Sequence, residues 1–507
     1  MSNMKTVLTS KQMKLLEKVT IEQIGIPSLV LIEKAAGAAY KLIECMKVKT
    51  VLVFAGNGNN GSDGYFLADM LNKSGYKVKL VFTGNEDKRT KENEILSKRF
   101  IDNGGIQIEN YLEEKADLYV DAMLGIGISR DLEGKYLEAV KYINGLKGKV
   151  LALDIPTGLN SDTGKVQGEA IKADYTICFG SYKKGLFLGE GPDYTGRLLF
   201  DSAGIFPLEY VENNGYTDIP ECELKCIEED DIASLLYERK VTGNKGTFGK
   251  VIIIAGSKEM KGAALLASRG AMAVGAGMVK ILTDKECENA YLSVAPELMC
   301  GIYNDISDDK LDREFDWCNT VVIGPGLSQS EEAFRLVEYT VNNCPKTVVV
   351  DADGLNILAD NMKWLLERKE KGYQTIITPH PMEFTRLFNV NIKDRKYEDV
   401  SFLKEMASKY GVILVAKNAR TIIASDSECF INRYGNSGLG RAGSGDILSG
   451  VIGGLSYPCH DNMKAAVLAV AFHALGGDRA AKKYSEYTLT SDRIIEGIME
   501  TVEALAK

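Results

Sequence analysis

The amino-acid sequence predicts an α/β protein with two domains, each built on a parallel sheet with helices on both faces. Short, continuous apolar runs alternate with helix-like segments along most of the chain, which is typical of strands buried on both faces. The alternation stops between residues 206 and 239, where turn residues dominate, and then starts again. The chain of 507 residues is also too long for one ordinary hydrophobic core. We therefore place the domains at residues 1–217 and 222–507.

Composition and charge exclude several classes of function. The chain is 45% hydrophobic and 26% charged, as expected for a globular protein, and its net charge of −9 argues against a nucleic-acid-binding protein. No apolar run is long enough to span a membrane and no signal peptide is evident, so we expect a cytoplasmic protein without a membrane partner. The ten cysteines include no CxxC pair and only three histidines are present, which argues against structural zinc, a disulfide framework and a histidine-centred triad.

The first half begins with apolar residues at helical spacing over residues 9–46, interrupted at Gly25-Ile26-Pro27. β-rich runs then recur with helix-like segments between most of them, which predicts parallel strands at 50–55, 77–82, 118–121, 150–154 and 174–179. Functional residues in such sheets collect at the carboxyl ends of the strands. The segments that follow the predicted strands are therefore the first place to look for a site.

The first predicted strand ends in a glycine-rich segment, residues 56–64. It contains a formal GxGxxG pattern, so a dinucleotide-binding dehydrogenase has to be considered, but that pattern alone is a weak signal. Asn59, Asn60 and Asp63 add side-chain oxygens that a pyrophosphate-binding turn does not require. The segment therefore points to a site that also binds through side chains.

Two further strand ends, residues 121–127 and 154–158, carry a carboxylate each. Taken singly, Asp121 and Asp154 fit loop caps better than catalysts. Three polar loops on one sheet edge favour a shared site instead, because the carboxyl ends of parallel strands lie together. Amide, carboxylate and hydroxyl oxygens with few charges suit an alkali or alkaline-earth ion better than a transition metal.

The segment from Thr9 to Gly37 and the motifs NNGSDG, VDAMLGIG and DIPTG together resemble the N-terminal domain of the YjeF type, the NAD(P)HX epimerase, over about the first 205 residues. The resemblance implies a Rossmann-like parallel sheet and a potassium ion held by Asn60, Asp121 and Thr157. It also implies a substrate site made of Asn59, Asn60, Gly61, Ser62, Asp63, Gly125, Ile126, Gly127, Ile128, Ser129, Arg130, Asp131 and Asp154.

From residue 250 the strand pattern restarts and predicts strands at 251–255, 278–282, 321–323, 348–351, 374–378, 412–416 and 421–424. The loops of the two halves do not align, so we expect a second α/β domain rather than an internal repeat. His473 lies midway along an apolar helical stretch, residues 463–483, and we expect it to be a core histidine with a satisfied hydrogen bond.

A glycine-rich segment, residues 435–446, runs directly into an apolar stretch at 447–455 that predicts a buried helix. Such a loop leaves backbone N–H groups unpaired and directed at one point, which attracts phosphate. Asp446 lies at the mouth of this helix, where a second negative charge is costly unless it takes a proton from a hydroxyl that is being phosphorylated. Taken alone, the pattern fits a helix cap after a flexible turn equally well.

Four motifs of the second half, GPGL, DADGLN, ITPHPxE and AGSGD, resemble the ribokinase-like kinases and, more narrowly, the NAD(P)H-hydrate dehydratase domain, over about residues 235–505. The resemblance implies a ribokinase-like α/β fold that uses ADP or ATP with Mg2+, and a substrate site of Ala263, Gly326, His380 and Asp446. It implies nucleotide contacts from Lys417, Asn418, Ala419, Arg420, Thr421, Asn436, Gly443, Ser444 and Gly445. The chain departs from the two family patterns at Ser62, Met382 and Arg441.

These resemblances predict a bifunctional repair enzyme for hydrated nicotinamide cofactors, with NADHX or NADPHX and ADP or ATP as small-molecule partners. Hydration of the ring leaves a hydroxyl, which is a poor leaving group, and phosphoryl transfer to it makes elimination feasible. Asp446 is the expected base for that step, and Asp154 is the expected acid or base of the epimerase that interconverts the R and S hydrates. We also expect a homo-oligomer.

Two other functions remain open. A ribokinase-type kinase for a sugar or another small alcohol would share the glycine-rich loop but leave the phosphate on its product, so a stable phosphorylated product would favour it. Alternatively, the first domain is a non-catalytic ligand- or protein-binding module fused to an enzyme. A folded first domain without epimer exchange would support that alternative.

Overall fold

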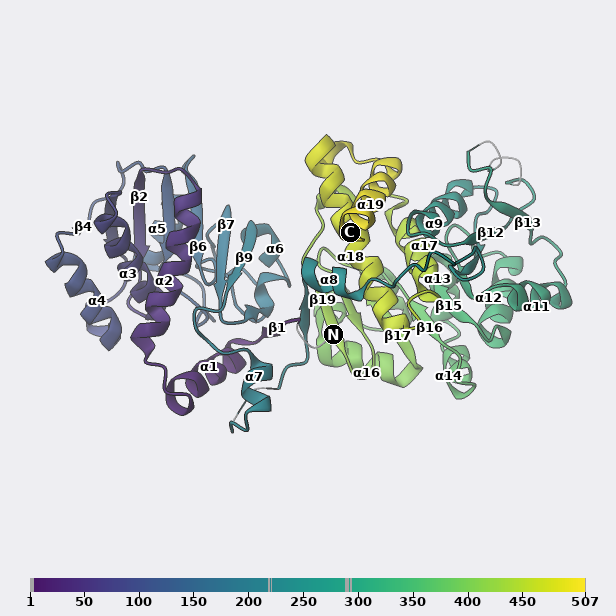
Figure 1. Cartoon of the computed structure of the whole chain (residues 1–507), viewed down its shortest axis with the longest axis horizontal. Coiled ribbons are helices and arrows are strands. Elements are labelled where there is room, and N and C mark those ends of the chain that lie inside the picture. The colour runs from purple at the N-terminus through teal and green to yellow at the C-terminus, as the bar shows by residue number, and fades with distance from the viewer. Residues whose placement is uncertain (1–3, 218, 220, 288–290, 292–293, 507) are drawn as a thin grey trace. The chain divides into compact units, whose positions relative to one another are not determined.

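The computed structural model describes residues 4–217, 219, 221–287, 291 and 294–506. It divides into two compact units: the first is Lys5–Cys222, and the second is Glu223–Lys507 together with Met4. Purple to blue marks the N-terminal unit in Figure 1, and teal to yellow marks the C-terminal unit. The domain limits predicted at 217 and 222 lie beside this division, and independent folding of each domain stays a prediction.

Helices and strands alternate along the N-terminal unit. Its helices are α1 (Ser10–Lys18), α2 (Ser28–Cys45), α3 (Asn59–Lys73), α4 (Lys91–Asp102), α5 (Gly134–Asn144), α6 (Gly191–Tyr194) and α7 (Leu208–Asn213), with a π-helical turn at Val19–Gln23 and 3-10 turns at Glu86–Lys88 and Lys184–Leu186. Its strands are β1 (Lys5–Leu8), β2 (Thr50–Ala55), β3 (Lys77–Phe82), β4 (Ile106–Ile108), β5 (Leu118–Ala122), β6 (Lys149–Leu153), β7 (Tyr175–Phe179), β8 (Tyr182–Lys183) and β9 (Arg197–Asp201).

A seven-stranded parallel sheet in the order β4-β3-β2-β5-β6-β7-β9 forms the centre of this unit, which confirms the predicted Rossmann-like architecture. Val51 and Val53 of β2 pack into the core that α2, α3 and α4 cover (Figure 1). Leu52 and Phe54 point to the opposite face, into a second core that includes α5. Because both faces of the sheet are buried, its strands are continuous apolar runs in the sequence.

The order of this sheet reverses between β2 and β5. β3 and β4 lie on one side of β2, and β5, β6, β7 and β9 follow on the other. At such a switch point the connections leave the two strands in opposite directions and open a crevice outside their carboxyl ends. The polar segments that follow β2, β5 and β6 therefore meet at one place.

The C-terminal unit repeats the alternation. Its helices are α8 (Glu229–Leu235), α9 (Lys261–Ala273), α11 (Asp308–Trp317), α12 (Glu331–Asn343), α13 (Asp353–Ala359), α14 (Lys363–Glu370), α15 (Pro381–Phe388), α16 (Val400–Tyr410), α17 (Ser444–Ser456), α18 (Asn462–Tyr484) and α19 (Ser491–Leu505). Its strands are β10 (Lys225–Ile227), β11 (Lys250–Ile254), β12 (Met278–Thr283), β13 (Met299–Ile302), β14 (Thr320–Ile323), β15 (Thr347–Val350), β16 (Thr375–Ile377), β17 (Val412–Ala416), β18 (Ile422–Ala424) and β19 (Cys429–Asn432).

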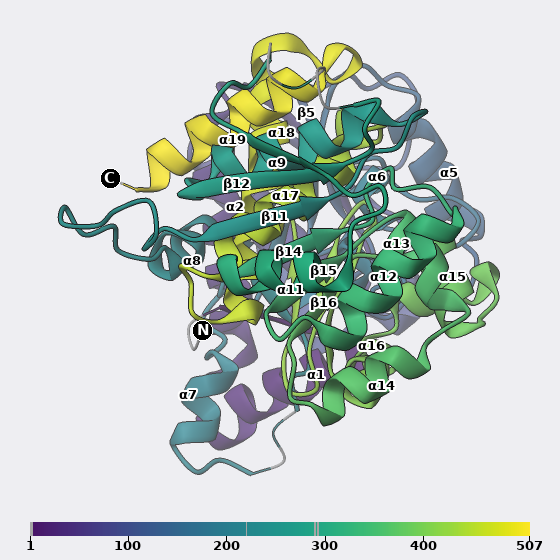
Figure 2. The same cartoon turned by 90° about the vertical axis from the view of Figure 1, so that its right-hand side faces the viewer.

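These strands form a sheet in the order β13-β12-β11-β14-β15-β16-β17-β18-β19-β10, in which only β18 runs antiparallel to its neighbours. Figure 2 shows β12, β11, β14, β15 and β16 side by side. One face of the sheet packs on α9, α17, α18 and α19, and α17 contacts β11, β14 and β15 directly. The glycine-rich loop before α17 is thereby held at the edge of the sheet.

Two expectations from the sequence are corrected here. No strand was expected between residues 206 and 239, yet β10 lies there, because a strand this short shows no period of its own. Residues 59–63 were expected to be a loop, yet they form the first turns of α3. Because α3 is buried on nearly all sides, its polar and glycine residues do not produce an amphipathic helical pattern.

Within the described ranges, no helix has the length and apolar character that a membrane crossing requires. The expected homo-oligomer stays a prediction.

Candidate active sites

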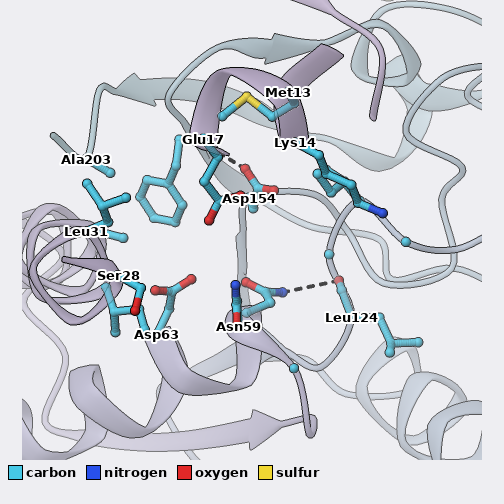
Figure 3. Close-up of a pocket in the computed structure, with 18 of the residues that line it drawn as sticks. Met13, Lys14, Glu17, Ser28, Leu31, Asn59, Asp63, Leu124, Asp154 and Ala203 are labelled. Carbon is cyan, nitrogen blue, oxygen red and sulfur yellow. Dashed lines mark hydrogen bonds between the residues drawn. The ribbon is translucent and has the colours of Figure 1, made fainter. Parts of the chain in front are cut away.

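The crevice of the N-terminal sheet contains a cavity of about 480 Å3 (Figure 3). Apolar side chains from α1, α2 and the strand ends cover much of its wall, among them Met13, Leu31, Ile32, Met123, Phe179 and Ile205. Polar side chains reach it from α1, from the first turns of α3, from the end of β6 and from β8, among them Glu17, Asn59, Asn60, Asp63, Asp154 and Lys183. An apolar enclosure with a few convergent polar groups is typical of a small-molecule site.

The structure places some of the predicted substrate residues in this cavity and others outside its lining. Lining it are Asn59, Asn60, Asp63, Gly125, Ile126, Gly127 and Asp154. Outside its lining are Gly61, Ser62, Ile128, Ser129, Arg130 and Asp131. Ser62 Oγ donates instead to the carbonyl of Gly58 within α3, at 3.2 Å. The role of each of these residues in substrate binding stays a prediction.

The predicted potassium ligands Asn60, Asp121 and Thr157 meet around the backbone of Leu124. Asn60 Nδ2 donates to the carbonyl of Leu124 at 3.2 Å, and the amide of Leu124 donates to Thr157 Oγ1 at 3.0 Å. Thr157 in turn donates to both oxygens of Asp121, at 2.7 Å from Oγ1 and at 2.7 Å from its backbone N. The ends of β5 and β6 and the first turn of α3 thus bring the three side chains together.

Two features of this cluster fit a bound monovalent cation. Asn60 Oδ1 is buried and has no hydrogen-bond partner among the described residues. An unsatisfied buried acceptor costs about 1–3 kcal/mol, which a cation ligated there would offset. Burial also raises the pKa of Asp121 to about 6, against the opposing hydrogen bonds from Thr157 and Met123, and a nearby cation would favour the carboxylate. One carboxylate among neutral oxygens matches a weakly charged, oxygen-preferring ion.

Asp154 follows β6 and is held in an unusual backbone conformation, with φ of 66°, which non-glycine residues rarely adopt outside functional sites. Its Oδ1 accepts hydrogen bonds from the backbone N of Phe179, at 3.2 Å, and from Lys183 Nζ. Lys183 Nζ also donates to the carbonyl of Phe179 at 2.7 Å. Together these contacts fix the orientation of the Asp154 carboxylate at the cavity wall.

The sequence does not single out Glu17 or Lys183, although both line the cavity. Glu17 is one of several polar residues on the amphipathic helix α1. Lys183 belongs to a two-residue strand, and only its burial, with 1% of its surface exposed, marks it as unusual. Burial of a lysine is a tertiary property, so no local signal could have revealed it.

In the C-terminal unit, the ends of β15, β16 and β17 bring Asp351, Glu383 and Lys417 together. Lys417 Nζ lies 2.7 Å from Asp351 Oδ1 and 3.9 Å from Glu383 Oε2. Burial raises the pKa of Glu383 to about 7, with Lys417 opposing and Asp351 reinforcing the shift. Asp351 and Glu383 lie within the DADGLN and ITPHPxE motifs but were not among the predicted site residues.

The predicted phosphate loop leads into α17, whose N-cap is Gly443 with φ of 90°. Asp446 lies in the first turn of this helix, and no side chain caps its N-terminus by a hydrogen bond. The backbone N–H groups of the first turn therefore lack a side-chain cap and remain available to an anion. The N-cap position itself is occupied by Gly443, and whether Asp446 acts as a base or only as part of the helix start stays a prediction.

Asp446 is surrounded by other carboxylates. Burial raises its pKa to about 6, Asp351 and Asp353 reinforce the shift, and Lys417 opposes it. A Cβ on Gly445 would lie 3.5 Å from Lys417 Nζ, so the ammonium group faces the start of α17. A carboxyl group with a pKa near neutral is well matched to accept a proton during catalysis.

The predicted nucleotide-binding segments lie next to one another. The side chain of Arg420 donates to the carbonyls of Tyr434 and Gly435, at 3.1 and 2.8 Å. This contact joins the segment 417–421 to the loop that contains Asn436, whose Nδ2 donates to Asp478 Oδ1 at 2.8 Å. Asn418, Ala419 and Thr421 belong to the same segment after β17.

Ser444 and His473 form a buried contact behind the phosphate loop, with 3.0 Å between Ser444 Oγ and His473 Nε2. Burial lowers the pKa of His473 to about 4, so this histidine is neutral near pH 7. The expectation of a core histidine with a satisfied hydrogen bond is confirmed, and its partner turns out to be a residue of the loop.

The predicted substrate residues Ala263 and Gly326 are neighbours, since a Cβ on Gly326 would lie 2.7 Å from that of Ala263. His380 caps α15, where its Nδ1 accepts from the backbone N of Met382 and of Glu383 at 3.1 and 3.3 Å. Burial, reinforced by Lys417, lowers the pKa of His380 and favours its neutral form. Met382, which departs from the family pattern, is half exposed.

Comparison with known proteins covers both units. The family model described as "YjeF-related protein N-terminus" matches residues 28–185, and the model described as "NAD(P)H-hydrate dehydratase" matches residues 251–500. The chain is 33% identical over 490 residues to a bifunctional NAD(P)H-hydrate repair enzyme of Coxiella burnetii, which covers 95% of this chain and 96% of that one. It is 31% identical over 473 residues to the corresponding Escherichia coli protein, over 92% and 88% of the two chains.

A solved structure shares the fold of part of the chain. The ribokinase-like superfamily protein of Enterococcus faecalis V583 is 22% identical, with a TM-score of 0.50, and the match covers 56% of this chain and 96% of that one. This likeness supports the predicted ribokinase-like fold.

Proposed function

The chain belongs to the family of bifunctional NAD(P)H-hydrate repair enzymes, and on that premise we propose that it restores hydrated nicotinamide cofactors in two steps. The N-terminal unit interconverts the R and S epimers of NADHX or NADPHX. The C-terminal unit dehydrates the S epimer with ADP or ATP. The observation that carries the proposal is the presence of two sheet-edge sites in one chain, one around Asp154 and the other around Asp446.

The epimerase step requires reversible exchange of the hydroxyl at a ring carbon. The cavity of about 480 Å3 offers an apolar wall for the ring and fixes the Asp154 carboxylate beside Gly125. Asn60, Asp121 and Thr157 would hold potassium, which supplies a fixed positive charge near the substrate when it is bound. The role assigned to Asp154 is proton transfer to and from the exchanging hydroxyl or water.

The dehydratase step requires the ring hydroxyl to become a better leaving group. The oxygen of the ring hydroxyl attacks the terminal phosphorus of ADP or ATP while Asp446 takes the proton of the hydroxyl. The backbone N–H groups at the start of α17 stabilise the charge on the phosphoryl oxygens. Elimination of phosphate then restores the dihydronicotinamide ring. Asp351 and Asp446, beside the start of α17, would hold Mg2+ that enters with the nucleotide, and the ion would neutralise further charge on the phosphates.

The proposal is tested with purified protein and a mixture of the two NADHX epimers. Recovery of the NADH absorbance is expected to go to completion with ADP or ATP and Mg2+, whereas only epimer exchange is expected without a nucleotide. Chelation of Mg2+ should stop dehydration and leave epimer exchange unchanged. Accumulation of a stable phosphorylated product would contradict the dehydratase and support a small-alcohol kinase.

A further inference from the structure

The cavity of the N-terminal unit holds three carboxyl groups but a single fully buried ammonium group. Glu17, Asp63, Asp154 and Lys183 all line it. Figure 3 shows Glu17, Asp63 and Asp154 directed toward the same space from α1, α3 and the end of β6. Such a cavity stabilises one buried ion pair far better than three separate carboxylates. Which carboxyl groups remain unpaired in the cavity therefore depends on which of them the ammonium group of Lys183 contacts.

Lys183 contacts Asp154. Its Nζ makes an ion pair with Asp154 Oδ1, and among the described residues no other carboxylate lies within ion-pair distance of it. Its remaining contacts are the carbonyl of Phe179, at 2.7 Å, and the thiol of Cys178, at 3.5 Å. Burial raises the pKa of Cys178 to about 11, so the thiol is neutral and does not compete for the ammonium charge.

The two oxygens of Asp154 have different surroundings. Oδ1 accepts the hydrogen bonds from Phe179 and Lys183. Oδ2 lies 3.9 Å from the place that a Cβ on Gly125 would occupy. Because Gly125 has no side chain, Oδ2 faces the cavity without obstruction. One oxygen is thus held by the protein and the other is available to a ligand.

In the part of the chain that the structure describes, Glu17 and Asp63 have no ammonium group within ion-pair distance. Burial, and after it the charge of Asp154, raises the pKa of both Glu17 and Asp63. Lys183 opposes the shift in each case, and Lys14 and Glu92 act weakly on Glu17 with opposite signs. The neutral forms of Glu17 and Asp63 are therefore favoured.

We propose that Lys183 is a positioning residue that assigns the roles in epimerisation: its ammonium group holds Oδ1 of Asp154 so that Oδ2 faces the substrate as the proton acceptor, and it leaves Glu17 and Asp63 as proton donors. This inference rests on the epimerase function proposed above and adds the origin of its acid and its base. Nothing in the local sequence or in the family comparison points to Lys183 or Glu17.

The step balances in atoms and charge. A protonated carboxyl group donates its proton to the ring hydroxyl, the C–O bond breaks, and water leaves while the ring nitrogen contributes its lone pair to form a C=N bond. Water then adds to the other face of the same carbon and gives a proton to Asp154. Proton exchange through the released water returns both carboxyl groups to their starting states.

The test is the pH dependence of epimer exchange in the full-length protein without nucleotide, with Lys183→Met and Lys183→Arg. Lys183→Met removes the contact that orients Asp154, so it should lower kcat more than it changes KM. Because Lys183 opposes the upward pKa shift of Glu17 and Asp63, its loss should also move the high-pH limb, which reports the proton donor, upward. Lys183→Arg should restore the wild-type limb. Lys73→Met is the matched control, because Lys73 pairs with Asp69 at 2.8 Å and does not line the cavity.

An unchanged pH profile in folded Lys183→Met would overturn the proposal. If Lys183→Met does not fold, the pH profiles of epimer exchange in Glu17→Gln and Asp63→Asn are measured instead. Loss of the high-pH limb in at least one of these variants supports the proposal, and retention of the limb in both overturns it. Failure of the proposed epimerase function is distinguishable from failure of the role of Lys183, because the wild-type protein would then exchange no epimers at any pH. The S-epimer dehydratase activity, measured with nucleotide, should be equal in all variants.

Discussion

The two sites each place a lysine beside carboxylates at the carboxyl edge of a parallel sheet. They differ in whether the lysine forms an ion pair with the proposed catalytic base. Lys183 is paired directly with Asp154, the proposed base of the N-terminal site. Lys417 is paired with Asp351 at 2.7 Å and lies 3.9 Å from Glu383, while the proposed base Asp446 forms no ion pair among the described residues. The pKa of Asp446 is accordingly raised by burial to about 6.

This difference in lysine pairing suits the two reactions, epimerisation in the N-terminal site and phosphoryl transfer in the C-terminal site. In the N-terminal site, the direct ion pair with Lys183 holds one oxygen of the proposed base Asp154 and leaves the other oxygen to the substrate. A base beside phosphates must take its proton and then coexist with more negative charge, so a pKa near neutral suits it better. The N-terminal lysine therefore orients the proposed base, and the C-terminal lysine lies near the start of α17, where phosphate is expected.

The largest expected effect separates the two activities. Asp446→Asn keeps the shape of the side chain but accepts no proton at neutral pH, so dehydration should fall by roughly 10²–10⁴-fold. Nucleotide binding should persist or tighten, because a negative charge beside the phosphates is removed. Epimer exchange in the same variant is the internal control and should not change. A variant that keeps most of its dehydratase rate would end the role proposed for Asp446.

The reverse separation is expected for Asp121→Ala. Loss of the one charged ligand should reduce epimer exchange by about 10–100-fold and abolish its response to potassium, by analogy with the cost of disrupting metal-site ligation. Replacement of K+ by Li+ in wild-type protein should mimic this loss, and Asn60→Ala should weaken the potassium response. Dehydration of the S epimer should be unaffected. Epimer exchange that is indifferent to both potassium and these substitutions would rule out the cation site.

A smaller effect concerns pH and stability together. Because the pKa of Asp446 is raised from 3.8 to about 6 in the folded protein, dehydration should decline as pH falls through 6. The folded state binds this proton more tightly than the unfolded state, so the group stabilises the fold at low pH and that contribution is lost as pH rises to about 6. Asp446→Asn should therefore be more stable than wild type above that pH, by on the order of 1–3 kcal/mol. Urea denaturation at pH 5 and pH 8 should show a smaller gain at the lower pH, because the advantage of the variant builds up between pH 3.8 and about 6.

The smallest effect tests whether the two regions are independent. Fragments 1–217 and 222–507, expressed separately, should each fold and keep one activity. The side chain of Gln12 donates to the carbonyl of Glu221, so extending the first fragment to residue 222 should add about 0.5–1.5 kcal/mol, the usual net value of one hydrogen bond. Two insoluble fragments would show that the units need each other.

Much of the fold was predictable because both sheets are parallel and buried on both faces. In the C-terminal unit, predicted and observed strand bounds agree within one residue, as at Val412–Ala416 and Met278–Thr283. Several strands escaped prediction. The three-residue β4 and β10 have too few residues to show a pattern, whereas β9 was missed although it has five residues. Asn59–Asp63 was assigned to a loop because glycine and asparagine disfavour helices unless tertiary packing compensates.

By itself the sequence determined the two-domain α/β architecture, the polar strand ends and the phosphate loop, because apolar periodicity and glycine-rich turns are local properties of the chain. Only the tertiary structure decided the pairing of those groups: Lys183 with Asp154, Asp121 with Thr157, and Lys417 with Asp351 rather than Asp446. The physical reason is that burial and ion pairing depend on segments far apart in the chain. The same carboxylate can become a fixed anion, a proton donor or a base with a pKa near neutral, according to what lies beside it.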